Sequence, residues 1–320
     1  MAPPVDLGLL VVGEINPDII VAGAHAQPRF GQTERYVRSI RLAVGSSSVI
    51  TACGATRLGL RTAFVGVVGD DLFGRFMLDE MRARGIDMSA CRIDPELPTG
   101  VTVVLDTGAD RAMLTAPGAM ASLHAEEVPL ALLMRARHLH VGSWFLQDRL
   151  RPGLPGLFAA AHAEGLTTSL DPGWDPAEEW QGLQEILAQT DVFLPNTAEA
   201  RAIGGTSDVA AAAQAIRGVG PEGMTVVVKQ ADRGALAVRG SASVTSAALR
   251  VTVADAVGAG DSFDAGFLCG YLQGWPLADA LELAVACGAL STRRAGGTDG
   301  QPTLEEARAA LLAAGRDLPE

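Results

Sequence analysis

The sequence has few cysteines and no long apolar run. Its four cysteines lie far apart without a CxxC or similar metal-binding spacing, so we expect reduced, packed thiols and no disulfides. No segment is apolar over the length of a transmembrane helix, and no basic residues precede the short apolar run near the amino terminus, as they would in a signal peptide. These absences predict a cytoplasmic protein with no membrane partner.

Basic residues are also in short supply. The 25 Lys and Arg residues against 37 Asp and Glu residues give a formal net charge of −12, which repels nucleic acid and anionic membranes. We therefore expect a small-molecule partner and no nucleic acid. Apolar residues, in contrast, are abundant: 48% of the 320 residues are hydrophobic, so the chain can bury a large core.

Strand-like and helix-like segments alternate along most of the chain. Apolar, β-branched runs predict strands, and amphipathic segments between them predict helices. The expected strands are 7–15, 61–67, 138–141, 167–170, 192–194 and 225–228, with helices at 48–58 and 72–84, an antiparallel strand group within 235–253 and a helical carboxyl-terminal region. This alternation predicts an α/β fold with a mostly parallel sheet covered by helices on both faces.

Two other segments break the alternation. Residues 19–42 are polar and aromatic, which suggests short strands exposed on one face. Residues 100–106 and 111–116 form a second strand pair, joined by the turn-forming run TGAD. The two segments are expected to meet as one small sheet.

The strongest chemical signal is the run DAVGAGD at 255–261, followed by SFDAGF. Apolar residues at helical spacing predict a helix that begins close to Asp261, with Gly258, Ala259 and Gly260 at its amino end. Small residues there leave N–H groups bare at the positive end of the helix dipole, which suits an anion such as a γ-phosphate. A turn that merely caps the helix is the alternative, but the flanking aspartates favour an anion site.

This run resembles the second signature, D-T-x-G-A-G-D, of the ribokinase-like (PfkB) carbohydrate kinase family. The resemblance implies that Asp261 is the catalytic base toward the accepting hydroxyl and that residues 258–260 form the anion hole. Ala256 stands where the family has Thr. This change removes one hydroxyl and leaves the base and the backbone cradle in place.

The resemblance implies a fold and an assembly as well. The family has a three-layer α/β/α Rossmann-like core and a small β-sheet lid, whose closure excludes water. Here the implied lid is 19–42 and 99–117, and the implied core is 1–18, 43–98 and 118–320. The same resemblance implies that the protein uses ATP and Mg²⁺ and binds a monovalent cation such as K⁺ near Asp255. It also implies a homodimer formed through the lid.

The amino-terminal third resembles the sugar-binding part of the family. Asn16 and Asp18 follow the first strand. The resemblance implies that Asp18 hydrogen-bonds the hydroxyl groups of the sugar. An ordinary turn cap is the alternative for Asp18. Gly45 and Ser46 begin a segment similar to the first family signature. Counting along it places Ile50 where the family has a substrate-binding Asn, so the identity of the substrate stays open.

The carboxyl-terminal half resembles the nucleotide-binding part. Asn196 and Glu199 match an N-x-x-E element that holds magnesium and phosphates through water, but Asn followed by Glu at this spacing is also a capping box. The remaining matched residues are assigned to ATP by the resemblance: Lys229, Ala231 and Gly234 in a K-x-G-x-x-G-like segment, and Gly288 and Ser291 near the adenine. A surface charge at a strand end is the alternative for Lys229.

Several conspicuous residues have simpler interpretations. His138 and His140 alternate on one strand without an evident third ligand, so packed histidines are favoured over zinc. We assign Trp144, Trp174 and Trp180 to the core or its rim. Arg111 follows a hairpin turn and could reach the site, although a solvated turn charge is the more common outcome.

The combined expectation is an ATP- and magnesium-dependent kinase that phosphorylates a hydroxymethyl group of a small sugar or sugar-like alcohol. A nucleoside kinase of the same fold and a catalytically silent sugar-binding or regulatory protein are the alternatives. A nicotinamide-dependent dehydrogenase is disfavoured because no GxGxxG follows the first strand. A P-loop kinase is disfavoured because the sequence contains no GxxxxGK[ST].

Overall fold

The computed structural model describes residues 5–23, 25–108 and 110–319. Its main element is an eight-stranded sheet in the order β14-β13-β12-β11-β10-β9-β1-β4, parallel except at β13 and β14. Its strands are β1 (Leu9–Val12), β4 (Thr62–Val65), β9 (His138–Val141), β10 (Thr167–Leu170), β11 (Val192–Phe193), β12 (Thr225–Lys229), β13 (Ala235–Arg239) and β14 (Ala242–Ser246). The mostly parallel order agrees with the predicted α/β fold.

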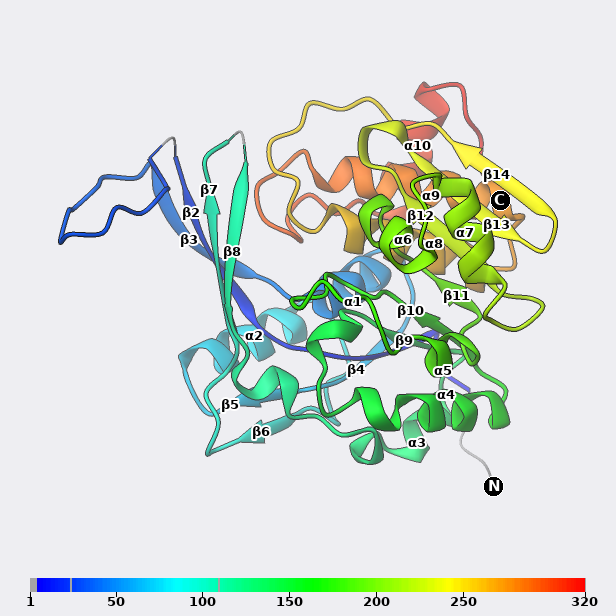
Figure 1. Cartoon of the computed structure of the whole chain (residues 1–320), viewed down its shortest axis with the longest axis horizontal. Coiled ribbons are helices and arrows are strands. Elements are labelled where there is room, and N and C mark those ends of the chain that lie inside the picture. Colours follow the sequence, from blue (N-terminus) through cyan, green and yellow to red (C-terminus); the bar gives the residue numbers. More distant parts are fainter. Residues whose placement is uncertain (1–4, 24, 109, 320) are drawn as a thin grey trace.

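Helices cover both faces of this sheet and so make three layers (Figure 1). One face packs against α3 (Leu130–Leu133), α4 (Leu154–Ala163), α5 (Gln184–Leu187), α6 (Thr197–Gly204) and α7 (Val209–Arg217). The other packs against α1 (Ser47–Arg57), α2 (Leu72–Ala83), α8 (Ala259–Leu272), α9 (Leu277–Ser291) and α10 (Leu304–Ala313). None of the helices within the described residues has the length and apolar character to cross a membrane.

Strand β1 shows why the sheet is buried on both sides. All four residues of β1 are apolar and inaccessible to solvent. Because successive side chains of a strand point to opposite faces, Leu10 and Val12 enter one core while Leu9 and Val11 enter the other. A continuous apolar run is therefore what this central position requires.

Two predicted strands differ in the structure. The expected strand 61–67 is interrupted at Gly66, where a side chain would approach the Gly13 carbonyl oxygen to 2.7 Å, and the chain then continues in a separate two-stranded sheet. That sheet pairs β5 (Val67–Gly69) with β6 (Arg92–Asp94). The antiparallel group expected within 235–253 ends earlier, because β14 stops at Ser246.

A third, four-stranded sheet, called here the small sheet, has the order β3-β2-β7-β8. Its strands are β2 (Pro17–Ala22), β3 (Ser39–Val44), β7 (Val101–Asp106) and β8 (Arg111–Ala116), so it joins two segments far apart in the sequence. It projects from one side of the three-layered core in Figure 1. The loop between β7 and β8 contains Ala109, which lies outside the described residues.

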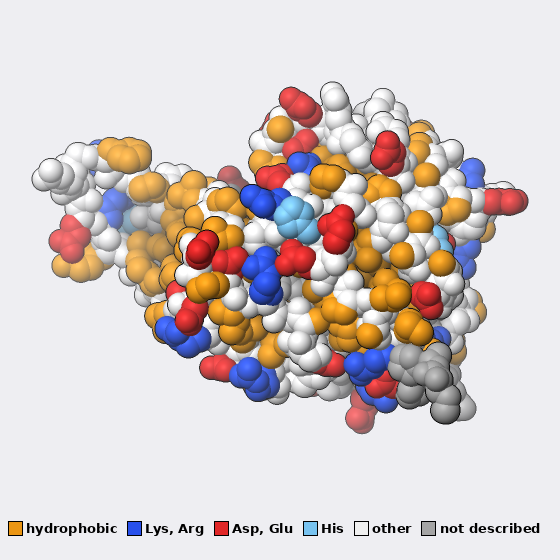
Figure 2. Space-filling model, turned by 90° about the horizontal axis from the view of Figure 1, so that it is seen from below, with side chains coloured by type: hydrophobic (Ala, Val, Ile, Leu, Met, Phe, Trp, Pro, Cys, Tyr) orange, Lys and Arg blue, Asp and Glu red, His pale blue; other side chains and the backbone are white. Residues whose placement is uncertain are grey.

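Register pairs give the small sheet two different faces. One row across the four strands is Ala43, Asp18, Thr102 and Thr115. The next residue along each strand points to the opposite face, and there the rows are entirely apolar: Leu42, Ile19, Val103 and Leu114, then Ile40, Val21, Leu105 and Ala112. Viewed from below, the part of the molecule that projects to the left carries gathered hydrophobic side chains (Figure 2).

Candidate active site

A cavity of about 1960 Å³ lies between the small sheet, the first turns of α1 and α8, and the carboxyl ends of the parallel strands. Ligands of open α/β sheets bind at this edge. The residues from the sequence analysis that line it are Asn16, Asp18, Ser46, Asn196, Glu199, Lys229, Ala231, Gly234, Gly258, Ala259, Gly260, Asp261 and Gly288. The fold therefore brings the proposed acceptor and nucleotide residues to one place.

Two predicted residues of the substrate and ATP sites, Gly45 and Ser291, do not line this cavity. Gly45 lies behind the Asp18 carboxylate, where a side chain at Gly45 would come within 2.2 Å of Asp18 Oδ1. Ser291 is buried, and its hydroxyl donates to the Gly288 carbonyl oxygen at 2.9 Å. Both residues support the cavity wall from behind.

Asp255, the predicted ligand of a monovalent cation, also lies outside the cavity lining. Its two carboxylate oxygens each accept a backbone N–H at 2.9 Å, from Val257 and from Gly296, and Arg41 is 4.0 Å away. These contacts tie the glycine-rich loop to the segment that follows α9.

The start of α8 has the geometry of an anion site. Gly258 precedes the helix with φ = 72°, and a side chain there would come within 2.7 Å of Gly297 Cα, so only glycine fits. The helix begins at Ala259, two residues earlier than Asp261. The N–H groups of a first turn have no acceptor within the helix, so Gly260 and Asp261 present bare donors at the positive end of the dipole.

An ion-paired cluster lies beside this turn. Lys229 Nζ donates to Asp171 Oδ2 at 2.7 Å and to the two oxygens of Asp264 at 2.9 and 3.1 Å. Lys229 ends β12, Asp171 directly follows β10, and Asp264 lies in α8 one turn beyond Asp261. Lys229 is thus no surface charge, and we call these three residues the lysine cluster.

The charges of the lysine cluster act on Asp261. Burial and the nearby Asp171 raise the pKa of Asp261, Lys229 lowers it, and the result is about 6. Burial alone would lower the pKa of Lys229, but Asp171 and Asp264 together raise it above its usual value. Lys229 therefore stays protonated, and its charge offsets part of the rise in the pKa of Asp261.

Asp171 and Asp264 were missed in the sequence analysis. Each carried a local signal: Asp171 directly follows a strand of the parallel sheet, and Asp264 lies three residues after Asp261 on a helix. Oxygen atoms of the two residues lie within 4.8 Å of one another and of Asp261. Lys229 already provides the positive charge among these carboxylates.

The N-x-x-E element forms a capping box at the start of α6. The Asn196 side chain accepts the N–H groups of Ala198 and Glu199 at 2.8 and 3.0 Å, and Glu199 Oε2 accepts the Asn196 N–H at 2.8 Å. Burial and the Asp171 charge raise the pKa of Glu199 to about 7. The same two residues line the cavity, so the capping role and a role toward a ligand are compatible.

The opposite end of the cavity is formed by the small sheet. The Asn16 amide donates to Thr102 Oγ1 at 3.2 Å, and Thr102 and Thr115 share a hydrogen bond at 3.0 Å. Asp18, in the same row, is only 8% exposed and has no hydrogen-bond partner among the described residues. Burial and the Asp261 charge raise the pKa of Asp18 to about 7. This carboxyl group is available to a ligand.

A second buried carboxylate anchors the start of α1. Glu14 accepts hydrogen bonds from Ser46 Oγ at 3.0 Å, Ser48 Oγ at 2.6 Å and Gln147 Nε2 at 3.1 Å. Ser46 has φ = 68°, a conformation that normally favours glycine. The Glu14 contacts hold Ser46 in this strained conformation, and its hydroxyl caps α1 by accepting the Val49 N–H.

The conspicuous residues that the sequence analysis left outside the site fall into two groups, those that line the cavity and those that are buried away from it. Arg111 and Trp174 line the cavity, and Trp174 is 48% exposed. The two histidines are buried: Ser169 Oγ lies 2.7 Å from His138 Nε2 and 2.8 Å from His140 Nδ1. Burial lowers the pKa of both histidines, so they are neutral packed side chains.

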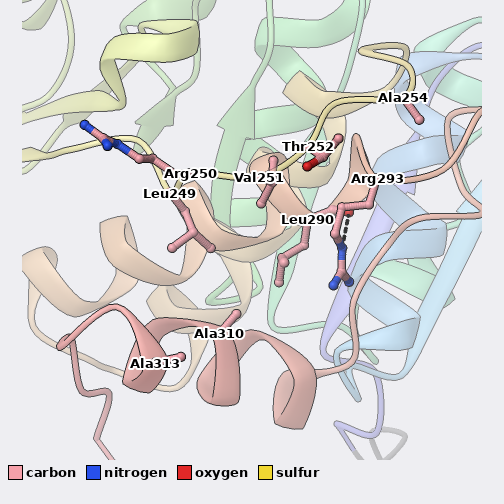
Figure 3. A pocket seen from close by; sticks show the side chains of 9 residues that line it. All are labelled: Leu249, Arg250, Val251, Thr252, Ala254, Leu290, Arg293, Ala310 and Ala313. Carbon is pink, nitrogen blue, oxygen red and sulfur yellow. Dashed lines mark hydrogen bonds between the residues drawn. The ribbon is translucent and has the colours of Figure 1, made fainter.

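A smaller pocket lies behind one wall of the site. Its lining comes from the segment 249–254, the end of α9 and α10, and Arg293 Nε donates to the Leu290 carbonyl oxygen there (Figure 3). Leu249, Arg250 and Val251 border this pocket and the large cavity alike. No residue from the proposed site list lines the smaller pocket.

Known proteins share the family and the fold of this chain. A family model described as pfkB family carbohydrate kinase matches residues 7–304. A fructokinase from Klebsiella pneumoniae is 31% identical over 83% of this chain and 91% of its own length, and a 2-dehydro-3-deoxygluconokinase from Bacillus subtilis is 30% identical over 82% and 84%. An E. coli structure described as a ribokinase II in complex with ATP and Mg²⁺ has a TM-score of 0.83 at 23% identity, covering 96% of this chain and 99% of that one.

Proposed function

This chain belongs to the pfkB family of carbohydrate kinases, and on that premise we propose that Asp261 and the start of α8 transfer the γ-phosphoryl group of ATP to a hydroxymethyl group of a small sugar or sugar-like alcohol. The observation that carries the proposal is the position of a half-buried carboxylate beside the bare N–H groups of a glycine-rich helix start. Both groups line the cavity that also contains the free Asp18 carboxyl group.

The proposed reaction uses each group for one task. Asp18 and its neighbouring hydroxyl groups hold the acceptor, and Asp261 accepts the proton of the reacting hydroxyl. The new bond forms between that oxygen and the γ-phosphorus, while the bond from phosphorus to the β-phosphate oxygen breaks and ADP leaves. The N–H groups of the anion hole, residues 258–260, stabilise the negative charge on the transferring group, and this stabilisation is the main catalytic requirement of phosphoryl transfer.

The nucleotide occupies the other end of the cavity in this proposal. Ala231, Gly234 and Gly288 border it, and the small residues leave room for the nucleotide. Glu199 and Asn196 are the residues that would hold Mg²⁺ through water, and the ion supplies charge neutralisation to the phosphates. Asp255 holds the glycine-rich loop through the Val257 and Gly296 N–H groups, and the proposal keeps a monovalent cation such as K⁺ near it.

We further propose that the small sheet closes over the cavity and joins two subunits into a homodimer. Its outer face presents two complete apolar rows, in which Ile40, Leu42 and Leu114 are exposed. A contiguous apolar patch of this kind marks an interaction site. A second copy would cover it with an identical face. A cytoplasmic location is proposed from the four cysteines, which are all unpaired.

The test of the proposed function is Asp261→Asn, assayed by ADP release with a panel of sugars. Removing a general base costs about 10²- to 10⁴-fold in kcat, while binding of ATP with Mg²⁺, measured by calorimetry, should stay close to that of the wild type. Ser262→Ala is a neighbouring control that leaves the carboxylate in place. Wild-type turnover retained by Asp261→Asn would refute the assignment.

A further inference from the structure

We propose, on the premise of the function above, that Ser47 is a positioning residue for Asp261, because its hydroxyl group holds the carboxylate that receives the proton of the acceptor. Ser47 is the first residue of α1 and is half-buried. Two features support this role: the contact between the amino-terminal turns of α1 and α8, and the buried hydrogen bonds that fix the first turn of α1.

The amino-terminal turns of α1 and α8 pack against each other. Thr51 Oγ1 donates to the Asp261 carbonyl oxygen at 3.2 Å, and a side chain at Gly54 would come within 2.8 Å of Ala265 Cβ. Residues four apart lie on the same face of a helix, so Ser47, one turn before Thr51, also faces the start of α8. Ser47 and Asp261 both line the cavity. The Ser47 hydroxyl group therefore lies beside the Asp261 carboxylate.

The Ser47 hydroxyl group acts on this carboxylate as a hydrogen-bond donor, and the interaction lowers the pKa of Asp261. A hydrogen bond to the charged form of an acid favours that form. A carboxylate can accept several hydrogen bonds, so one bond from Ser47 leaves lone pairs free for the proton of the acceptor. The donor thus favours the charged form of Asp261 and orients it without blocking it as a base.

The residues on both sides of Ser47 are fixed by the buried carboxylate of Glu14. Ser46 Oγ lies 3.0 Å from Glu14 Oε1, and Ser48 donates to Glu14 through its hydroxyl group at 2.6 Å and its N–H at 3.2 Å. This close approach depends on Gly13, where a side chain would come within 2.1 Å of Ser48 Oγ. Ser47 cannot move without breaking these buried contacts, so its hydroxyl group is preorganised.

Charged groups from several elements also act on Asp261. Asp171, which follows β10, and Glu14, which follows β1, raise its pKa, whereas Lys229, at the end of β12, lowers it. The other titratable groups that lie around it come from the small sheet, α6 and α8, and they are Asp18, Glu199 and Asp264. A substitution at Ser47 leaves all of these charges in place. A changed pKa in a Ser47 variant therefore reports the loss of the hydrogen bond.

The first test measures the pKa of Asp261 directly. The carboxyl carbon of Asp261 is followed by NMR in protein labelled at aspartate, and its signal is assigned with Asp261→Asn. Ser47→Ala should raise this pKa by about half a pH unit to one pH unit, because the donor to the charged form is lost. Ser47→Thr, which keeps a hydroxyl group, should restore most of the wild-type value.

Thr56→Ala is the matched control for this measurement. It removes a hydroxyl group from the same helix, but that group donates to the Ala52 carbonyl oxygen at 2.9 Å within α1. The pKa of Asp261 should therefore stay at its wild-type value. Equal pKa values of Asp261 in wild type and Ser47→Ala overturn the inference.

Turnover provides the second test. Ser47→Ala should lower kcat by about three- to tenfold and move the step that Asp261 contributes to kcat/KM toward higher pH, while KM for the acceptor changes less than about twofold. In the Asp261→Asn background, Ser47→Ala should cause no further loss of kcat, because residues that act as a unit are not additive. An equal loss in both backgrounds shows that Ser47 acts on the acceptor or the nucleotide instead, and overturns the inference.

The same variants separate this inference from the proposed function. If Asp261→Asn retains wild-type turnover, the proposed function fails, and the positioning role of Ser47 fails with it. If Asp261→Asn loses turnover but Ser47→Ala changes neither the pKa of Asp261 nor the pH profile of kcat/KM, this inference fails and the proposed function stands.

Discussion

The two sheets that meet at the cavity differ in how their carboxylates are compensated. At the edge of the eight-stranded sheet, Asp171 and Asp264 surround the built-in cation Lys229, and all three side chains are largely buried. On the small sheet, Asp18 is equally buried but has no hydrogen-bond donor among the described residues, and Arg111, whose charge lowers the pKa of Asp18, forms no ion pair with it.

This difference suggests that the residues around Asp261 serve the phosphoryl transfer, whereas those around Asp18 serve substrate recognition. The groups of the eight-stranded sheet and α8 hold one another in place before a ligand arrives, so the electrostatic environment of Asp261 is preorganised. On the small sheet, Asp18 gains hydrogen-bond donors only from a bound substrate. Its contribution to the binding free energy therefore depends on which substrate binds. With the closure proposed for the small sheet, this division would let the correct acceptor bind before transfer and so limit ATP hydrolysis.

The largest effect is expected from removing the cation of the lysine cluster. Lys229→Met leaves two buried carboxylates without their cation, and breaking a buried pair in this way costs about 3–5 kcal/mol of unfolding free energy. Urea denaturation measures the loss. As a matched control, Arg75→Met removes the exposed partner of Asp70, where both side chains are more than half exposed, and should cost less than about 1 kcal/mol. Equal stability of the two variants would show that the cluster is not what stabilises this edge.

A second prediction separates the two carboxylates by pH. The pKa values of about 6 for Asp261 and about 7 for Asp18 lie above those of free aspartate, so each group loses its charge as pH falls toward neutrality and below. The acid side of kcat/KM should therefore fall in steps, at first because Asp18 is protonated and then because the base Asp261 is lost, up to tenfold per pH unit for each group.

Asp18→Asn provides the control for this profile. It should remove the step near pH 7 that Asp18 contributes and keep the step near pH 6. Glu199, whose pKa is also about 7, is present in both proteins, so the difference between the two profiles isolates Asp18. If the variant and the wild type have the same pH profile of kcat/KM, Asp18 does not contribute a step of its own and the prediction is wrong.

The sequence predicted the eight-stranded sheet and the glycine-rich turn better than it predicted the contacts between them. An apolar run predicts strand β1, and the local spacing of Gly258 and Asp261 predicts the glycine-rich helix start. The lysine cluster depends on β10, β12 and α8 meeting at one point, and no local pattern contains that information. For the same reason Lys229 looked like a candidate surface charge, whereas the structure surrounds it with carboxylates.

The small sheet shows a similar limit. Alternation places Arg111, Met113 and Thr115 on one face of a strand, but only the register with β7 shows that this face borders the cavity. Ser46 offers a further example, because its positive φ depends on the distant Glu14 carboxylate that holds it. The sequence could name Ser46 as a site residue without revealing the strain.

The smallest expected effect on turnover comes from the outer face of the small sheet. Leu114 lies in the middle of β8, is 61% exposed and points away from the cavity. Leu114→Lys places a charge in an apolar row, so a dimer that buries this face should dissociate, while the monomer's free energy of unfolding changes by about 0.5 kcal/mol or less. Sedimentation velocity measures the mass, and Leu312→Lys, at a 66% exposed leucine of α10, is the matched control. If both variants keep the wild-type mass, the outer face is not the subunit interface, and the small sheet contributes to recognition through its inner face alone.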